Sequence, residues 1–169
     1  MSILWNSTTL KKIANAEGNM VWEASGIEID SRKIKKGDLF CAIKGVNHNG
    51  HDYIKAAINN GAVACLVSEK TKLNSNIAFS KVKNVLNTIE LMAKDLRNRS
   101  TSKFIAITGS VGKTGTKDMI KMAFSKIAKT HANESSYNNY IGVPLSLSKT
   151  PIDTNFCILE VGMNKKGEI

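Results

Sequence analysis

The stretch ITGSVGKTGTKDMI, residues 107–120, carries residue types that can bind phosphate. Gly112, Lys113 and Thr114 follow one another at its centre. A glycine lets the backbone turn tightly so that consecutive N–H groups face an anion, a lysine reaches terminal phosphates, and a threonine hydroxyl can bind Mg²⁺. The general phosphate-loop pattern begins with a glycine, but Ile107 stands at that position. These residues alone fit a phosphate loop of a different form, a damaged loop, or a chance turn.

The segments on either side of the loop are those that phosphate binding requires. Residues 103–108 predict a buried strand, and an amphipathic helix is predicted over about 113–128. Its inward-facing residues are expected to be Ile120, Ala123, Phe124 and Ile127. A short apolar helix near IGVPLSLSK and a buried strand over 155–162 follow. Strand, loop and helix in this order favour a phosphate site over a chance turn.

The first part of the chain predicts a strand–helix–strand unit. LFCAI (39–43) and AVACLVSE (62–69) are nearly continuous apolar runs, typical of strands covered on both faces. HDYIKAAINNG (51–61) lies between them and has apolar residues at helical spacing, so the two strands are expected to be parallel with a right-handed crossover. The alternating stretch GIEIDSRKI (26–34) predicts a further strand near a sheet edge.

An amphipathic helix predicted over 84–98 and a polar stretch after it place a domain boundary near residue 101. The expected fold class is α/β, with a small N-terminal domain over 1–100 that contains the βαβ unit. Residues 101–169 are expected to be the first part of a phosphate-loop domain with a parallel sheet. The last predicted strand lies close to the end of the chain, and a buried parallel strand needs neighbours and a covering helix. We therefore expect this second domain to be incomplete.

Composition limits the partners. The net charge of +10 is spread along the chain, with only short clusters such as RKIKK (32–36), so it argues against a nucleic-acid-binding stripe. The same net charge fits the attraction of a small anionic ligand. Cys41, Cys65 and Cys157 lie singly in apolar runs without disulfide or zinc-ligand spacing, so we expect buried reduced thiols.

The sequence carries no signal for the secretory pathway or a membrane. MSILWNSTTLKKIANA lacks the pattern of a signal peptide, and no apolar run approaches about 18 residues. We expect a cytoplasmic protein, with no nucleic acid and no membrane as partner, that acts as a monomer.

Three stretches of the second part resemble the Mur ligase family, the ATP-dependent amino-acid ligases of bacterial peptidoglycan precursor synthesis. They are TGSVGKTGTK, SSYNNYIGVPLSL and LEVGMNKKGEI, in that order. The family's phosphate loop has the shorter form T-G-x-x-G-K-T, so no glycine is expected at position 107. The matching residues are Thr108, Gly109, Gly112, Lys113 and Thr114, then Asn138, Asn139, Ile141, Gly142 and Pro144, and finally Glu160, Gly162, Asn164, Gly167, Glu168 and Ile169.

The N-terminal part extends the resemblance. Residues 30–69 are similar to the UDP-binding domain of these enzymes, most specifically of those that add D-alanyl-D-alanine to UDP-N-acetylmuramoyl-tripeptide. Much of this pattern is shared with the members that add diaminopimelate or lysine, so these members are an alternative. A different phosphate-loop enzyme, a small kinase or GTPase, would need the complete glycine pattern or a base-reading N/T-K-x-D motif, and the sequence has neither.

The resemblance implies a reaction and a set of site residues. The γ-phosphate of ATP moves to the carboxylate of the tripeptide, and the amine of D-alanyl-D-alanine attacks the acyl phosphate. The implied catalytic residues are Lys113 and Glu160, and the implied Mg²⁺ ligands are Thr114 and Glu160. ATP would be bound by Gly109, Ser110, Val111, Gly112, Lys113, Thr114, Asn138 and Asn139, and the UDP substrate by Ser31, Arg32, Lys44, Gly45 and Val46. Solvated surface roles for Arg32 and Lys44, and an asparagine-rich turn for Asn138 and Asn139, stay open as alternatives.

Three departures from the family pattern stand out. Gly115 replaces the usual Ser or Thr in the first turn of the helix, and Lys165 stands where His is frequent. The family's carbamylated lysine, a histidine of its metal site and the C-terminal domain that binds D-alanyl-D-alanine have no counterpart in residues 1–169. The chain is thus expected to be inactive alone, as a piece of a longer protein, a split or decaying gene product, or a non-catalytic nucleotide- or UDP-sugar-binding remnant.

Overall fold

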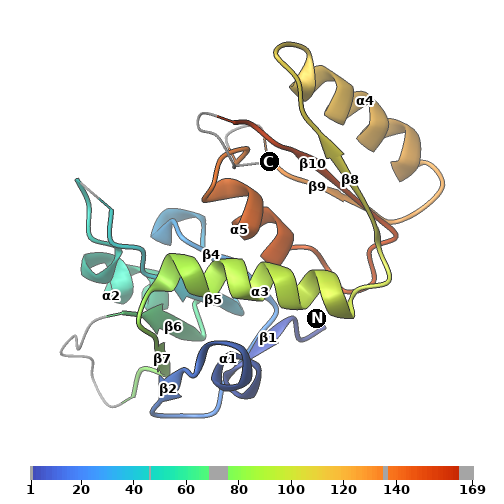
Figure 1. Ribbon diagram of the computed structural model, residues 1–169. Coiled ribbons are helices and arrows are strands. Elements are labelled where there is room, and N and C mark those ends of the chain that lie inside the picture. Colours follow the sequence, from blue (N-terminus) through green and yellow to red (C-terminus); the bar gives the residue numbers. More distant parts are fainter. Residues whose placement is uncertain (1, 46, 69–75, 135–136, 164–169) are drawn as a thin grey trace. The chain divides into compact units, whose positions relative to one another are not determined.

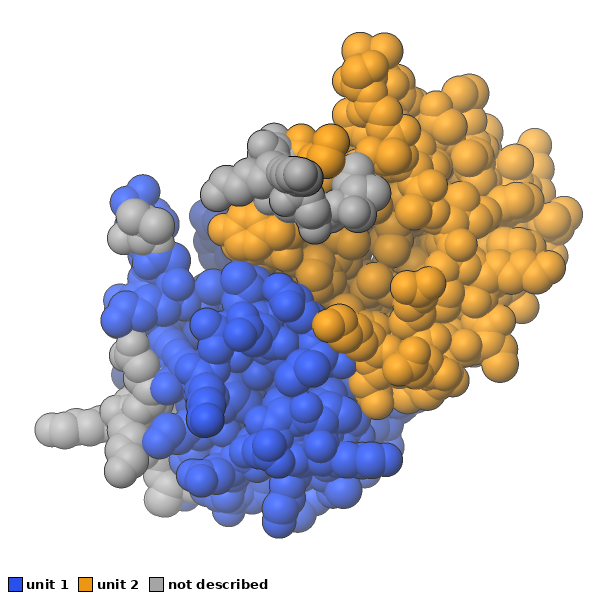
Figure 2. Space-filling model, viewed as in Figure 1, with its two compact units in different colours: residues 1–92 blue, residues 93–169 orange. Residues whose placement is uncertain are grey.

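The chain forms two compact units, unit 1 (residues 1–92) and unit 2 (residues 93–169), shown in Figures 1 and 2. The structure is a computed structural model that describes residues 2–45, 47–68, 76–134 and 137–163. The division between the units falls within helix α3 (Val85–Arg99). The sequence predicts a boundary near residue 101, just after the end of this helix, and the extent of each functional domain stays a prediction.

Unit 1 is built on a five-stranded sheet in the order β2-β7-β6-β5-β4. Its strands are β2 (Glu17–Gly18), β4 (Gly26–Glu28), β5 (Asp38–Cys41), β6 (Ala64–Val67) and β7 (Phe79–Lys81). The strands from β4 to β7 are parallel, and β2 is antiparallel to β7. Every residue of β5 and β6 is buried, which confirms the prediction of strands covered on both faces. The strand predicted within 26–34 is β4, at an edge of this sheet.

The predicted βαβ unit is confirmed. Between β5 and β6 the chain forms the 3₁₀ turn η2 (Gly50–Tyr53) and helix α2 (Ile54–Asn59), and the two strands pair in parallel. This unit supplies one hydrophobic cluster, in which apolar side chains of the helix meet alternate residues of the strands. Its buried members are Phe40, Ala42, Ile54, Ala57, Ala62, Cys65 and Val67.

The N-terminal segment forms a small antiparallel ribbon and a helix. Strand β1 (Trp5–Asn6) pairs with β3 (Glu23–Ala24), and helix α1 (Ser7–Ala14) begins where the Asn6 side chain accepts a hydrogen bond of 2.8 Å from the Thr9 N–H. Trp22 donates through Nε1 to the Ser80 hydroxyl at 3.1 Å, so this segment is tied to β7. A second 3₁₀ turn, η1 (Ser31–Lys33), follows β4.

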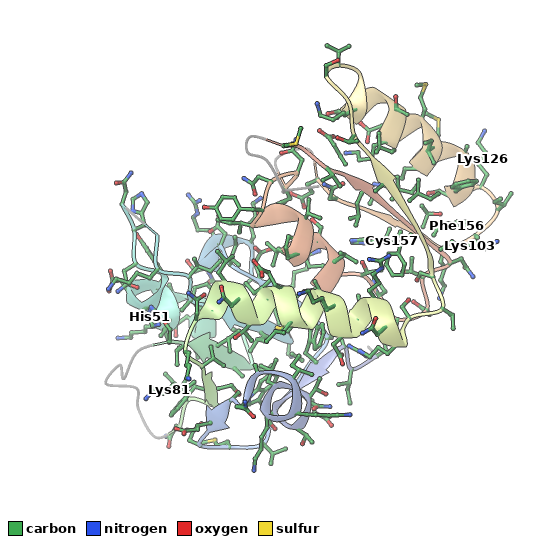
Figure 3. The ribbon with its side chains drawn as sticks, viewed as in Figure 1. His51, Lys81, Lys103, Lys126, Phe156 and Cys157 are labelled. Atoms are coloured by element: carbon green, nitrogen blue, oxygen red, sulfur yellow. The ribbon has the colours of Figure 1, made fainter. Side chains whose placement is uncertain are left out.

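Unit 2 is a three-stranded parallel sheet in the order β8-β10-β9. Its strands are β8 (Lys103–Ile107), β9 (Thr130–Ala132) and β10 (Phe156–Glu160), and its helices are α4 (Lys113–Ser125) and α5 (Gly142–Ser148). Lys103 and Phe156 are register partners at one end of this sheet (Figure 3). The mixed α/β architecture with parallel sheets is the predicted fold class.

Helices α4 and α5 cover opposite faces of this sheet (Figure 1). The Phe156 ring stacks on Phe124 of α4, with ring centroids 4.4 Å apart. The next residue, Cys157, lies 3.4 Å from the hydroxyl of Thr150, which closely follows α5. Because neighbouring residues of a strand point to opposite faces, side chains on the Phe156 face of β10 point toward α4. Glu160 belongs to that face.

Part of the helix prediction is wrong. The helix predicted over about 113–128 ends at Ser125, with Lys126 as its C-cap. Ile127 therefore lies outside the helical repeat and is 74% exposed, and Ala123 is exposed as well. Ile120 and Phe124 are half-buried. The buried residue of this helix is Lys117, so a pattern of apolar residues could not find its inward face.

The three cysteines lie buried in β5, β6 and β10, as predicted, and are free thiols. Burial raises the pKa of the Cys65 thiol to about 12 and that of Cys157 to about 11, so both stay protonated and unreactive at neutral pH. Within the described ranges, the structure has no helix with the length and apolar character that crossing a membrane requires.

Replacing Phe40 by alanine is expected to destabilise unit 1 by about 3–5 kcal/mol, because a fully buried ring leaves a cavity in the cluster. Trp5 and Trp22, the two tryptophans of the chain, both lie in unit 1, so urea unfolding followed by tryptophan fluorescence measures this change. Tyr53→Ala is the matched control, since Tyr53 is 46% exposed and should change stability by no more than about 0.5 kcal/mol. Equal losses from both variants would contradict this placement of the core.

Candidate nucleotide site

The predicted phosphate loop lies between β8 and α4. Gly109 and Gly112 have φ angles of 149° and 77°, in the range that favours glycine, so this turn depends on them. Gly112 is the N-cap of α4, and no side chain caps the helix there. The first-turn N–H groups of a 13-residue helix thus begin at the loop, where the helix dipole favours an anion. The loop residues Ser110 and Val111 are exposed.

The Lys113 side chain lies over this loop. Its Nζ donates a hydrogen bond of 2.7 Å to the Gly109 carbonyl, four residues earlier. The ammonium group is therefore held beside the same turn whose N–H groups can bind phosphate. A lysine in this position supplies positive charge to the terminal phosphates of a nucleotide.

The parallel pairing of β8 and β10 brings Glu160 to the loop. Glu160 is the register partner of Ile107, and the Val161 N–H donates to the Ile107 carbonyl at 2.9 Å. The Thr114 hydroxyl donates to Glu160 Oε2 at 2.8 Å, and Asn138 Nδ2 donates to Oε1 at 2.9 Å. Glu160 is only 2% exposed, so these hydrogen bonds compensate a buried carboxylate.

The oxygen atoms of this cluster fit a magnesium ion. Mg²⁺ is typically held by one or two carboxylates together with phosphates and waters, and a phosphate-loop hydroxyl is its common neighbour. Glu160 and Thr114 supply one carboxylate and one hydroxyl within hydrogen-bond distance of each other. In the part of the chain that the structure describes, no three His, Cys, Asp or Glu side chains lie together so that they could hold a metal ion.

The two asparagines of the second motif occupy different places. Asn138 touches Glu160, and its carbonyl accepts a hydrogen bond of 2.6 Å from the Gly162 N–H. Asn139 instead accepts from the N–H groups of Ile141 and Gly142 at 3.1 and 2.8 Å, and so holds the turn that leads into α5. The structure thus brings Asn138 into the cluster and uses the Asn139 side chain within its own turn, while a contact of Asn139 with nucleotide stays a prediction.

The predicted substrate residues of unit 1 follow the carboxyl ends of its strands. Ser31 follows β4 and is buried, and its carbonyl accepts from Asn60 Nδ2 at 2.8 Å. Lys44 and Gly45 follow β5 in a turn closed by the Gly45 N–H and the His48 carbonyl at 2.9 Å. Val46 lies outside the described residues. Carboxyl ends of neighbouring parallel strands share one sheet edge, which is where open α/β sheets bind ligands.

Arg32 is paired with Asp30. Its Nε and Nη2 donate to the two carboxylate oxygens of Asp30 at 2.9 and 2.8 Å, and the guanidinium side chain is 86% exposed. The hydrogen bonds from Arg32 lower the pKa of Asp30 to about 2. This pair holds the guanidinium at the surface, where it can turn toward a ligand or stay solvated.

His51 lies near the carboxyl ends of β5 and β6, and the sequence did not predict it as a site residue. Its Nδ1 lies 2.7 Å from Asn49 Oδ1, and its Nε2 accepts from the Ser68 N–H at 3.1 Å. An imidazole that donates from Nδ1 and accepts at Nε2 is neutral. It fastens the turn after β5 to the end of β6; Figure 3 labels His51. The sequence HNGHD (48–52) contains both Asn49 and His51. Only the fold shows that His51 reaches the residue after β6.

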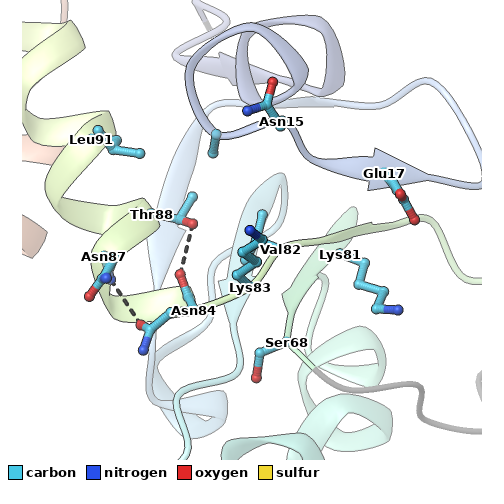
Figure 4. A pocket seen from close by; sticks show the side chains of 11 residues that line it. Asn15, Glu17, Ser68, Lys81, Val82, Lys83, Asn84, Asn87, Thr88 and Leu91 are labelled. Atoms are coloured by element: carbon cyan, nitrogen blue, oxygen red, sulfur yellow. Dashed lines mark hydrogen bonds between the residues drawn. The ribbon is translucent and has the colours of Figure 1, made fainter.

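A pocket of about 630 Å³ opens at the carboxyl end of β7, beside the start of α3 (Figure 4). Its polar lining includes Glu17, Ser68, Lys81, Lys83, Asn84 and Thr88. Asn84 begins α3 by accepting from the Asn87 N–H at 3.0 Å and from the Thr88 hydroxyl at 2.8 Å. None of the predicted substrate residues lines this pocket, and no sequence motif marks it.

Two glycines of unit 2 should respond in opposite ways to alanine. Gly115 lies in the first turn of α4, and a Cβ there meets no described atom within 4 Å. Gly115→Ala should therefore stabilise unit 2 by about 0.5–1 kcal/mol. At Gly142 a Cβ would lie 2.3 Å from the Tyr137 Cα, so Gly142→Ala should destabilise it by at least about 1–3 kcal/mol. Urea unfolding followed by far-ultraviolet circular dichroism measures both, and a destabilising Gly115→Ala would contradict the open space at that turn.

Comparison with known proteins extends these observations. The model of the Mur ligase family, catalytic domain, matches residues 23–108, and that of the Mur ligase middle domain matches residues 107–168. The UDP-N-acetylmuramoyl-tripeptide--D-alanyl-D-alanine ligase of Rickettsia prowazekii is 40% identical over 167 residues, which are 99% of this chain and 37% of the relative. The chain thus spans little more than a third of the length of that relative.

The solved structures that are similar to this chain include two bacterial ligases. The UDP-N-acetylmuramoylalanyl-D-glutamyl-2,6-diaminopimelate--D-alanyl-D-alanyl ligase from Acinetobacter baumannii has a TM-score of 0.83 and 28% identity, over 97% of this chain and 37% of the chain of that ligase. The MurF ligase of Thermotoga maritima, solved in complex with ADP, has a TM-score of 0.68 and 28% identity, over 85% of this chain and 33% of its own. Since the catalytic-domain model alone matches more than half of the residues, the chain belongs to the Mur ligase family.

Proposed function

We propose that this chain forms the UDP-substrate-binding and nucleotide-phosphate parts of a ligase that adds D-alanyl-D-alanine to UDP-N-acetylmuramoyl-tripeptide at the cost of ATP. The observation that carries the proposal is the pairing of Thr114 with the buried Glu160 at 2.8 Å, beside a glycine turn and Lys113. Its relatives, including that of Rickettsia prowazekii, bear the name of this ligase.

The geometry of unit 2 suits the transfer of a phosphoryl group. Such a transfer needs alignment and neutralisation of charge more than it needs a covalent partner. Lys113 would neutralise the β- and γ-phosphates, and the N–H groups at the start of α4 would hold them. The ADP in the Thermotoga maritima relative, which shares this fold, supports a nucleotide at the loop.

Thr114 and Glu160 would hold Mg²⁺ beside the phosphates. The ion would supply charge neutralisation on the phosphate oxygens. The protein's own part is to keep one carboxylate buried and oriented at the end of β10, where Asn138 and Thr114 hold its two oxygens. Asn138 would thereby orient a metal ligand rather than contact phosphate directly.

The proposed reaction joins two substrates in two steps. The tripeptide carboxylate takes the γ-phosphate of ATP and becomes an acyl phosphate, and ADP is released. The D-alanyl-D-alanine amine then attacks the acyl carbon, the C–N bond forms, and phosphate leaves with its bonding electrons. The UDP moiety would lie at the sheet edge of unit 1 that carries Ser31, Arg32, Lys44 and Gly45. That the protein is a monomer of the cytoplasm stays a prediction from the sequence.

Lys113→Met is expected to weaken the binding of ADP with Mg²⁺ at least tenfold, a loss of about 1.4 kcal/mol, because it removes the cation beside the phosphates. Isothermal titration calorimetry of the 169-residue chain measures the affinity. Lys126→Met is the matched control, because Lys126 is an exposed lysine at the other end of α4 (Figure 3). An unaltered chain that does not bind ADP, or equal losses in both variants, would refute the nucleotide site.

Release of ADP distinguishes the alternatives. If the chain contributes to ligation as proposed, sustained ADP release from ATP should require both UDP-N-acetylmuramoyl-tripeptide, which takes the γ-phosphate, and D-alanyl-D-alanine, whose attack on the acyl phosphate permits a further turnover. Release that instead requires diaminopimelate or lysine and the shorter UDP-linked peptide would assign the chain to the neighbouring ligase. Binding of ADP and UDP without any release, by a chain that also carries the family's C-terminal domain, would support a non-catalytic binding protein.

A further inference from the structure

Asn133 is a buried polar residue that the proposed site does not yet include. It directly follows β9 and is 3% exposed. Its Oδ1 accepts a hydrogen bond of 2.8 Å from the Glu160 N–H, and its Nδ2 donates to the Glu160 carbonyl at 2.9 Å and to the Tyr137 carbonyl at 2.8 Å. An asparagine amide has two N–H donors, so both are used here.

The Asn133 side chain continues the hydrogen bonding along β10 beyond the end of β9. The register pairing of β9 with β10 reaches Ile158 and Ala132, and one further backbone hydrogen bond of 3.4 Å runs from the Asn133 N–H to the Ile158 carbonyl. Beyond that point the Asn133 amide takes the place of a strand, because it accepts from the N–H and donates to the C=O of the same residue, Glu160. The backbone of Glu160 is thus held from both of its polar groups.

The same amide also holds the segment that carries Asn138. Its bond to the Tyr137 carbonyl fixes the residue directly before Asn138. Asn138 in turn donates to Glu160 Oε1. One side chain therefore sets the position of a carboxylate and of the amide that orients it.

Lys117 connects this arrangement to the helix of the phosphate loop. It is 3% exposed, lies three residues after Thr114 on α4, and donates through Nζ to the Asn133 carbonyl at 3.0 Å. Its charge has Asp118 Oδ1 at 3.2 Å as a partner. Residues three apart lie on the same face of a helix. From this face Thr114 reaches Glu160 at the end of β10, and Lys117 reaches Asn133 directly after β9. Helix α4 thus contacts the Glu160 carboxylate through Thr114 and contacts Asn133, which holds the Glu160 backbone, through Lys117.

We propose that Asn133, supported by Lys117, is a positioning residue for the metal-binding carboxylate of Glu160. This inference rests on the proposed function, in which Glu160 and Thr114 hold Mg²⁺ beside the nucleotide. Loss of a group that orients a metal ligand commonly weakens metal binding by about 10–100-fold. The affinity for the nucleotide in the absence of metal should be unaffected, because Lys113 and the loop are untouched.

The test compares Mg²⁺ dependence between two asparagine variants of unit 2. In Asn133→Leu, the Mg²⁺ concentration that gives half-maximal ADP binding should rise by at least about tenfold, while ADP affinity in EDTA stays as in the unaltered chain. Asn155→Leu is the control. Asn155 directly precedes β10, the strand that ends at Glu160, and its side chain accepts from the Lys129 N–H at 3.1 Å, at the opposite end of that strand. An unchanged Mg²⁺ requirement in a folded Asn133→Leu chain, or an equal rise in Asn155→Leu, overturns the inference.

A second variant and a structural measurement keep the inference testable on its own. If Asn133→Leu does not fold, Lys117→Met should raise the Mg²⁺ requirement in the same direction, and no rise overturns the proposal. If the unaltered chain binds no ADP with Mg²⁺, the proposed function fails instead. Crystal structures of the unaltered and Lys117→Met chains then decide, because a Glu160 carboxylate that stays in hydrogen-bond distance of Thr114 without the Lys117 amine contradicts a positioning role.

Discussion

The parallel pairing of β8 with β10 is the constraint on which the candidate site depends. Parallel strands place their carboxyl ends at one edge, so the turn that leaves β8 and the side chain that ends β10 must meet there. Glu160 pairs in register with Ile107, the last residue before the loop. In an antiparallel pair, the end of β10 would lie at the opposite end of β8, away from the start of α4.

Burial of Glu160 determines how the surrounding polar residues are used. A carboxylate that is 2% exposed loses its hydration, and it is tolerated only when its atoms find hydrogen-bond partners. Thr114 and Asn138 satisfy its carboxylate, and Asn133 satisfies its backbone. Several polar residues that look unrelated in the sequence therefore serve one side chain. A rigid carboxylate of this kind needs little reorganisation when it binds a cation.

The sequence predicted those features that depend on local pattern. The βαβ unit followed from apolar runs of strand length, and the loop followed from a motif with a strand before it and a helix after it. The prediction of Ile127 as an inward residue was wrong because the helix ends at Ser125, and no strong stop signal marks that end. The very short strand β9 has no apolar run. Asn133 and Lys117 could not be found, because their roles arise from contacts between segments far apart in the chain.

The hydrogen bonds of His51 have a consequence for unit 1. Because the Ser68 N–H donates to Nε2, that nitrogen must carry no proton. His51 lies in η2, after the loop that leaves β5, and Ser68 directly follows β6, so one side chain joins the connection after one strand to the end of the next. Lys44 and Gly45 lie in the loop between β5 and His51, and this hydrogen bond holds the far end of that loop.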